Sequence, residues 1–414
     1  MSTAKAMSPA VEKPAHIPDE LVFDFDYYAD PGLLAKGHDR ALEIVKEAPP
    51  IFWTPRNDGH WMLMGHKAVF EGSKATDLFS NSPIPWEDLQ AILNDLPEDQ
   101  KPLIPSPITL DPPLHTALRL PLQKAFSPKA MKAIETDIRK LASDLVASVK
   151  DKGGCEFMST LAEPLPVTVF LKMFGLPTER QGEYRALVKE HLASTDFDPG
   201  AVQARLRKVA NIMRDTILER KENPQDDVLS MLWATEIDGK PMTMHQIESY
   251  GVMIFVAGLD TVMNGMGLGA IHLAKNPEFQ NSLRADPSKV APGNEEMLRR
   301  YTFTLPVRFL TQDTEFQGAP MKKGEKVILM LPGADLDPSV YAEPATFNTQ
   351  RESVHIAFGV GPHRCLGSHL ARIEMNVLYE EMLKGLPEFR LDPSKPVQYH
   401  GGPVWGPEQV HLVW

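Results

Sequence analysis

The sequence predicts a mainly α-helical protein with small β-sheets at its periphery, and three observations lead to this fold class. Long segments carry apolar residues at spacings of three and four, the period of a helix that buries one face. Proline-rich connections separate these segments. Short alternating stretches beside glycines occur in the last third of the chain, where they favour hairpin strands. Helices should therefore dominate.

The helical period is clearest in six segments. It predicts helices over residues 128–149, 161–174, 201–220, 244–275 and 294–301, and a further helix that begins at Ser368. Hairpin strands are expected over residues 309–316 and 326–331, which are punctuated by Gly318 and Gly324.

Residues 81–113 contain many prolines and little clean periodicity, which predicts a long loop. Loops of this length inside a compact domain commonly cover a binding site, so we expect a substrate-covering role. An ordinary surface loop is the alternative interpretation.

The length of 414 residues and the 43% hydrophobic content are enough to bury a large core, and we expect a single domain over residues 21–414. Residues 1–20 lack the apolar run of a signal peptide or membrane anchor and are expected to form a mobile leader. The most apolar segment, near Met253, is broken by Asp260 and Asn264, so no membrane span is expected and a cytoplasmic location follows.

The formal net charge of -12 disfavours a nucleic-acid-binding protein. Only two cysteines occur, Cys155 and Cys365, which excludes a disulfide framework and a paired-cysteine metal site. Each cysteine therefore needs its own explanation.

The segment HIAFGVGPHRCLG, residues 355–367, places Cys365 in a glycine-rich loop that leads into a helix. The first amides of a helix lack partners and its dipole favours an anion, so a thiolate is stabilised there and can bind a metal. The glycines at 359, 361 and 367 allow tight turns and close approach to a flat ligand. For the loop alone, a buried structural cysteine is the alternative.

FGVGPHRCLG resembles the haem-binding signature FGxGxHxCxG of the cytochromes P-450 at every fixed position. The resemblance covers nearly the whole chain. It implies the triangular helical prism of that family, haem b as cofactor and Cys365 as the iron ligand. It also implies that Phe358 packs beside the thiolate and that amides after the cysteine, at Gly367, hydrogen-bond to sulfur and tune the iron.

EEMLRR places Glu296 and Arg299 three residues apart on one helix face, where most such pairs are solvated surface contacts. Downstream, PATFNTQR resembles the family's second arginine segment. The resemblance implies a structural network of Glu296, Arg299 and Arg351 that supports folding and haem retention.

VMIFVAGLDTVMNGMGLG is an apolar helix that contains Gly258, Asp260 and Thr261. A buried aspartate needs a partner or a function. The segment is similar to the family's oxygen-binding helix, AGxxT, which implies that Gly258 opens a groove for dioxygen while Asp260 and Thr261 organise water and protons. A threonine bonded to its own helix backbone is the alternative.

Buried haem propionates require cations or hydrogen-bond donors. DPPLHTALR resembles the segment that reaches the propionates, which implies roles for His115 and Arg119. Arg308 and His363 match further propionate positions, and His355 is an additional candidate. For an isolated histidine, a hydrogen-bonded structural role is the ordinary interpretation.

The resemblance is closest to the camphor-hydroxylating bacterial subgroup, through HIPDELVFDFDYY, AGLDT, EEMLRR and the closing VHLVW. The loop before DPP lacks the subgroup's tyrosine, and Pro306 stands where the subgroup has an aspartate, so camphor itself is not implied. A terpenoid or norisoprenoid is expected, with aromatic hydrocarbons and fatty acids left open; for Met253, helix packing is the alternative to substrate contact. The expected lining is almost wholly apolar: Met253, Val256, Ala257, Thr304, Leu305 and Val404, with Trp86 and Trp405 from loops.

The sequence contains no flavin or iron-sulfur motif, so electrons must come from a partner. The resemblance implies a [2Fe-2S] ferredoxin with an NADH-dependent reductase, docked near Arg119, Arg364 and Arg372, and a monomeric enzyme that uses dioxygen. Two rivals remain. A peroxygenase normally lacks the acid-alcohol pair, and a haem-based sensor or binding protein would need no oxygen-activating helix.

Overall fold

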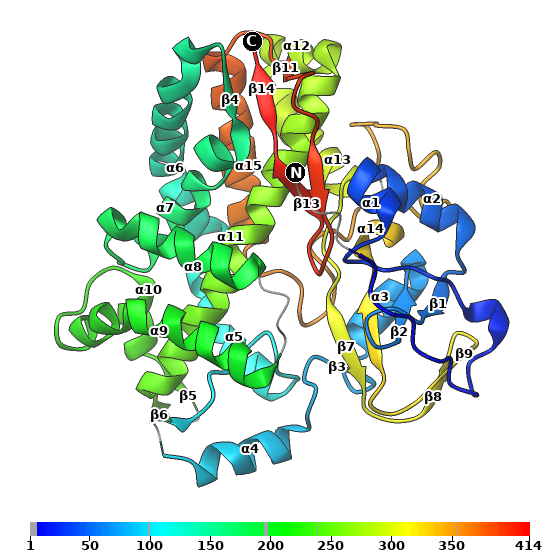
Figure 1. Cartoon of the computed structure of the whole chain (residues 1–414). Helices are drawn as coiled ribbons and strands as arrows, with labels where there is room; N and C mark the ends of the chain where they lie inside the picture. Colours follow the sequence, from blue (N-terminus) through cyan, green and yellow to red (C-terminus); the bar gives the residue numbers. More distant parts are fainter. Residues whose placement is uncertain (1–5, 98–99, 194–197, 238, 353) are drawn as a thin grey trace.

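The computed structural model describes residues 6–97, 100–193, 198–237, 239–352 and 354–414 (Figure 1). Helices make up one side of the molecule, and the largest sheet lies with the N-terminal helices on the other side. The expected mainly helical fold with small sheets is confirmed.

The N-terminal third alternates short helices with strands. Its elements are a 3-10 turn (Asp19–Leu21), α1 (Pro31–Lys36), α2 (Asp39–Glu47), β1 (Ile51–Thr54), β2 (His60–Leu63), α3 (His66–Lys74), β3 (Phe79–Ser80), α4 (Trp86–Asp95) and α5 (Leu114–Ala125). Strands β1 and β2 form a hairpin at one edge of a five-stranded sheet of order β1-β2-β10-β7-β3, whose other strands follow below.

The middle of the chain is almost entirely helical. It contains α6 (Pro128–Val149), β4 (Gly154–Glu156), a π-helical turn (Met158–Ala162), α7 (Pro164–Met173), α8 (Gln181–Ala193), α9 (Pro199–Glu222), α10 (Val228–Trp233), β5 (Glu236–Ile237), β6 (Lys240–Pro241), α11 (Met244–Lys275), α12 (Pro277–Ala285) and α13 (Val290–Arg300). Short 3-10 turns lie at Lys150–Lys152, Thr178–Arg180 and Pro287–Lys289.

The last part of the chain completes the sheets and adds one long helix. Its elements are β7 (Val307–Leu310), β8 (Thr314–Phe316), β9 (Ala319–Met321), β10 (Lys326–Leu329), α14 (Leu331–Ala334), α15 (Ser368–Gly385), β11 (Arg390–Leu391), β12 (Gln398–His400), β13 (Gly406–Gln409) and β14 (His411–Val413). Beside the five-stranded sheet there are a sheet of order β11-β14-β4 and the hairpins β12-β13, β5-β6 and β8-β9.

Helix α11 runs through the centre of the helical side (Figure 1). It starts with a capping box, in which Thr243 accepts from the Gln246 amide and the Gln246 side chain accepts from the Thr243 amide. By length and composition α11 could cross a membrane, but most of it is buried among the other helices. The central core helix of a globular protein has the same length, apolar composition and burial. The middle of α11 positions the side chains described in the next subsection.

Two of the expected helices coincide with α6 and α11 at both ends. The segment 161–174 is divided, because the π-helical turn ends just before α7 begins at Pro164, where a missing N–H costs nothing. The helix expected at 294–301 starts earlier, as α13, and the stretch 309–316 belongs to β7 and β8, which lie in different sheets.

The long loop expected over 81–113 is partly wrong, because α4 lies inside it. Prolines flank this helix without entering it, and Leu89 is its one buried residue, so the apolar period is too sparse to find from sequence. The described part of the expected mobile leader also differs from expectation. Ile17 is 1% exposed in the sheet core, and the amides of Ser8 and Val11 bind Asp26 and Pro55.

Candidate active site

An open region lies beside the middle of α11. Gly258 is exposed there although its helix neighbours Phe255 and Leu259 are buried, and a side chain added at Gly258 would meet nothing within 4 Å. Cys365 is accessible to solvent as well, although protein atoms surround its sulfur closely enough to desolvate it. The residue after it, Leu366, packs against the same apolar cluster as Ala257, so α11 and the cysteine loop border one region.

The backbone of the cysteine loop requires its glycines. Gly359 and Gly361 have φ of 67° and 75°, the left-handed region that other residues rarely adopt. A Cβ at Gly361 would also lie 2.9 Å from the Ser73 carbonyl oxygen. The turn closes when the Cys365 amide donates to the Phe358 carbonyl at 2.8 Å. The glycines thus allow the loop to bring Cys365 to the start of α15.

The surroundings of the Cys365 thiol act on its pKa in two directions. Burial raises the pKa of Cys365, while a hydrogen bond from the Gly367 amide and the positive charges of Arg119, Arg364 and Arg372 lower it. Donors and cations aimed at sulfur favour the thiolate, which is the form that ligates a metal. A bound cation would add to the same effect, so the site suits a metal ligand.

Arg372 and His355 share one carboxylate. Arg372 stacks on the Phe358 ring at 4.4 Å and donates to Glu295 at 2.5 and 2.9 Å. Although burial raises the pKa of Glu295, hydrogen bonds from His355 and Arg372 bring it down to about 2. The other ring nitrogen of His355 accepts from the Ala357 amide at 3.2 Å. Because both its nitrogens are in use, His355 is not free for a propionate, and its expected role was wrong.

Four other expected propionate ligands are brought together. The rings of His115 and His363 lie 4.0 Å apart, and Arg119 donates to the backbone carbonyl of Arg364 beside them. Both ring nitrogens of His115, Nε2 of His363 and Nε of Arg308 are buried without a hydrogen-bond partner in the described part of the chain. These side chains form a pocket of buried nitrogens that lack hydrogen-bond partners in the described residues.

Burial sets the charge state of this pocket. It lowers the pKa of His115 to about 4, with the charge of Arg119 as the next cause, and that of Arg308 to about 10. The pKa of His363 is also far below its usual value, first through burial and then through the neighbouring cations. Asp111 is near, but its oxygen is 4.0 Å from His363. Two buried carboxylates, such as haem propionates, would supply the missing acceptors.

The three expected oxygen-site residues lie on the open side of α11. Thr261 is half-buried and its hydroxyl donates to the Ala257 carbonyl at 3.0 Å, the local bond named above as the alternative. Burial raises the pKa of Asp260, while the charge of His400 and a hydrogen bond from Asn264 lower it. Asn264 donates to the Asp260 carboxylate at 3.1 Å. Asp260 and Thr261 therefore present an acid and an alcohol beside the space at Gly258.

Glu296, Arg299 and Arg351 form a closed buried network. Arg299 binds both carboxylate oxygens of Glu296 at 2.8 Å and donates to the Asp335 and Pro344 carbonyls. Arg351 approaches the same carboxylate at 3.5 Å. Every strong donor of Arg299 has an acceptor, as a structural role requires.

Four of the expected substrate contacts lie on two extended segments, and alternation along each segment places their side chains on opposite faces. Thr304 and Val404 form a β-bridge and are half-buried, whereas the residues that follow them, Leu305 and Trp405, are 1% and 0% exposed. Successive side chains of a strand point to opposite faces, so Leu305 and Trp405 enter the core with Phe25, and their expected substrate contact was wrong.

The remaining expected contacts come from α11 and α4. Val256 and Ala257 are half-buried beside Gly258. Met253 is 7% exposed and packs within the helical core, in agreement with helix packing, the alternative to substrate contact given above. Trp86, at the start of α4, is exposed. The half-buried side chains beside the open region are thus apolar or carry one hydroxyl.

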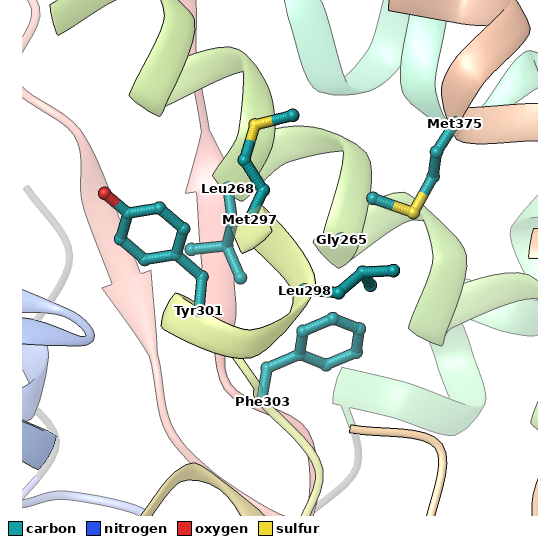
Figure 2. A pocket seen from close by; sticks show the side chains of 7 residues that line it. All are labelled: Gly265, Leu268, Met297, Leu298, Tyr301, Phe303 and Met375. Atoms are coloured by element: carbon teal, nitrogen blue, oxygen red, sulfur yellow. The ribbon is translucent and has the colours of Figure 1, made fainter. Parts of the chain in front are cut away.

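A small pocket nearby is not the site. Figure 2 shows it between α11, α13 and α15, lined by Gly265, Leu268, Met297, Leu298, Tyr301, Phe303 and Met375. A Cβ at Gly265 would already lie 3.3 Å from Met375 and Phe303, so the gap is part of core packing. The hydroxyl of Tyr301 bonds to His272 at 2.8 Å, which leaves no free polar group there for a ligand among the residues shown.

Three functional-site neighbours were missed by sequence reasoning: His400, Gly406 and Glu295. The one sequence signal concerns their neighbour Asn264, which stands one helical turn after Asp260 and can therefore contact it. His400 and Gly406 are far from α11 in the sequence, and Glu295 is far from the cysteine loop.

Known proteins resemble this chain in sequence and fold. The sequence model described as Cytochrome P450 matches residues 199–400. "Probable cytochrome P450 127A1" of Sinorhizobium fredii is 31% identical over 97% of this chain and 96% of its own, and a "Steroid C26-monooxygenase" of Mycobacterium tuberculosis is 32% identical over 93% and 95%. The crystal structures of CYP101J2 and CYP101C1 superpose with TM-scores of 0.86 each, at 30% and 29% identity. They cover 98% and 97% of this chain, and it covers 99% and 100% of theirs.

The relatives span the whole fold, and the donor pocket and the cysteine loop fit an iron porphyrin with two carboxylates. The chain therefore belongs to the bacterial cytochromes P450, monooxygenases whose cofactor is haem b.

Proposed function

We propose that this monooxygenase hydroxylates a compact apolar molecule of the terpenoid or norisoprenoid class. The observation that carries the proposal is the character of the open region beside α11. Val256, Ala257 and Val404 are half-buried there, and Thr304 adds a single hydroxyl. Such a wall binds by burial of apolar area and selects by shape, with few polar anchors.

The proposal assigns haem binding to residues at both ends of the site. Cys365 is the iron ligand, its sulfur accepts a hydrogen bond from the Gly367 amide, and its own amide donates to the Phe358 carbonyl. The unpartnered donors of His115, Arg308 and His363, together with Arg119, hold the propionates. When bound, the haem supplies the activation of dioxygen.

The chain's own residues supply space and protons. Gly258 leaves room beside the helix, since a larger side chain would occupy the open region. Asp260 holds a proton or a charge according to its shifted pKa, and Thr261 lies next to it on the same open side. Both are placed to hold or move a proton beside the space at Gly258. The buried network of Glu296, Arg299 and Arg351 keeps the nearby loops in place.

We further propose that a [2Fe-2S] ferredoxin, reduced by an NADH-dependent reductase, supplies the electrons to a monomeric cytoplasmic enzyme. Arg364 is exposed beside the cysteine loop, where an acidic partner could dock. Arg119 and Arg372 point inward to the Arg364 carbonyl and to Glu295, so they contribute charge and little surface.

A second candidate substrate class follows from the relatives. Two of them are described as a "Steroid C26-monooxygenase" and a "Methyl-branched lipid omega-hydroxylase", and the latter is 31% identical over 90% of this chain. Their names favour a substrate with a longer branched skeleton that packs against the same apolar side chains.

Substrate binding tests both candidates. Terpenoids, norisoprenoids, branched lipids, fatty acids and aromatic hydrocarbons are titrated into the haem-loaded protein, and the spin-state shift of the Soret band is recorded. We expect the largest shift with compact terpenoids, followed by NADH-dependent product formation with ferredoxin and reductase. A response only to fatty acids or aromatics would contradict the proposed class, and binding without NADH consumption would indicate a sensor.

A further inference from the structure

Asn264 links Asp260 to a second wall of the site. Its Nδ2 donates to the Asp260 carbonyl at 3.0 Å and to the Asp260 carboxylate at 3.1 Å. Since a backbone carbonyl only accepts, these bonds fix which end of the amide faces Asp260. The amide oxygen then points the other way, and it lies 3.2 Å from Nε2 of His400. An amide oxygen also only accepts, so Nε2 carries a hydrogen.

His400 ends β12 and has acceptors on both sides of its ring. Besides the Asn264 oxygen, the Gly401 carbonyl oxygen lies 3.3 Å from Nδ1. Both ring nitrogens of His400 thus lie within hydrogen-bond distance of an oxygen. His400 is half-buried, whereas Asn264 is 1% exposed. A half-buried imidazole is thus connected to the interior through one amide.

Gly406 provides independent support for this arrangement. It lies opposite His400 in the β12-β13 pairing, and a Cβ there would be 1.8 Å from the Asn264 amide oxygen. Gly406 is not among the glycines with positive φ, so its backbone does not require glycine. The missing side chain is explained by the space that the Asn264 amide occupies.

We propose that His400 is a positioning residue for Asp260 and acts through Asn264, which holds the Asp260 carboxylate in one orientation beside the open region. This inference rests on the proposed function, in which Asp260 delivers protons beside Thr261. His400 lies on the β12-β13 hairpin, outside α11, and through Asn264 it influences the titration of Asp260.

The electrostatics agree with the geometry. Burial raises the pKa of Asp260, and the charge of His400 is the largest cause in the opposite direction, followed by the Asn264 hydrogen bond. His38, which precedes α2, is a further titratable group that interacts with His400. Burial lowers the pKa of His38 to about 3, so it is neutral near pH 7 and does not replace His400.

The experiment titrates Asp260 directly. Haem-loaded protein labelled with 13C-aspartate is studied by NMR in its diamagnetic ferrous carbon monoxide form, and Asp260→Asn identifies the signal. His400→Gln keeps an N–H donor but removes the charge. We expect its Asp260 midpoint to move up by about one pH unit, the lower end of what a neighbouring charge produces. His411→Gln, on β14, is the matched control and should leave the midpoint unchanged.

Gly406→Ala gives a second variant that alters none of the three side chains. Because its Cβ displaces the Asn264 amide, we expect the same upward shift, whereas Gly182→Ala, where nothing lies within 4 Å, should have no effect. A midpoint equal to that of the unmodified protein in both His400→Gln and Gly406→Ala would overturn the inference. The Soret band of the same samples reports the proposed function separately, because an abnormal band would contradict cysteine ligation whatever Asp260 does.

Discussion

Two buried clusters of ionisable side chains differ in how completely they are paired. In the network of Glu296, Arg299 and Arg351, the carboxylate and the guanidinium groups bind one another and nearby carbonyls. In the pocket of His115, His363 and Arg308, buried nitrogens have no hydrogen-bond partner in the described residues. The first cluster pairs its charges within the chain, although Nε of Arg351 lies 3.5 Å from Glu296 and makes no hydrogen bond. The second has no carboxylate within hydrogen-bond distance among the described residues and would gain partners from an added anion.

Burial explains why the difference is informative. An unpaired donor in the interior costs free energy that the fold must offset, so such groups persist where a ligand completes them. A paired cluster needs no ligand, and loss of one partner leaves a charge stranded. Removal of a cationic side chain should therefore affect stability in the closed network and haem retention in the open pocket.

The largest effect is expected in the closed network. Arg299→Leu removes both short bonds to Glu296 and leaves the carboxylate with Arg351 at 3.5 Å. We expect the free energy of unfolding in urea to fall by about 3–5 kcal/mol. The double variant Glu296→Leu with Arg299→Leu should recover part of this loss, and a double variant as unstable as the single one would contradict the pairing argument.

For the pocket of His115, His363 and Arg308, we expect the free energy of unfolding to depend on pH. Burial lowers the pKa of His115 from 6.5 to about 4, so the unfolded chain takes up a proton in this range that the folded chain refuses. Stability is then fully present above pH 6.5 and falls toward pH 4, by about 2–3 kcal/mol. Unfolding of haem-free protein across this range measures the loss. His115→Phe should remove the share that His115 contributes and leave the share of the other buried histidines, His38, His60, His272 and His363.

Arg308 should matter mainly for haem. Arg308→Leu removes a buried cation whose Nε has no partner, so we expect little change in the stability of the haem-free protein. Loss of a charge-assisted bond of about 1.5–3 kcal/mol should speed haem release roughly 10- to 100-fold. Transfer to an excess of a haem acceptor gives the rate. A haem with esterified propionates should be released at similar rates from both proteins.

The smallest effect tests whether pairing matters without burial. Lys140 and Asp144 form an exposed pair on α6 at 2.9 Å, with 77% and 65% of their side chains accessible. We expect Lys140→Ala to change the free energy of unfolding by less than about 0.5 kcal/mol. An effect as large as that of Arg299→Leu would show that burial is not what separates the clusters.

The sequence predicted most of the elements that carry the site. The helix over 244–275 and the loop around Cys365 have strong local signals, since periodicity and glycine spacing need no knowledge of the rest of the chain. The network of Glu296, Arg299 and Arg351 was also anticipated, through family resemblance.

The errors share a physical cause, which is dependence on partners distant in sequence. His355 binds Glu295, a residue sixty positions earlier, and this contact cannot be read from the cysteine motif. Leu305 and Trp405 were assigned to the wrong face because strand alternation requires the register, which tertiary pairing sets. His400 was missed for the same reason, since its connection to α11 passes through a hairpin.

The most direct test of haem-thiolate ligation is the carbon monoxide difference spectrum of the reduced protein, recorded beside Cys365→Ala. We expect the red-shifted Soret band from which the family takes its name, and its loss in the variant, because only a thiolate ligand from Cys365 produces it. A band at the shorter wavelength of a neutral ligand in undamaged protein, or an unchanged band in Cys365→Ala, would contradict the account.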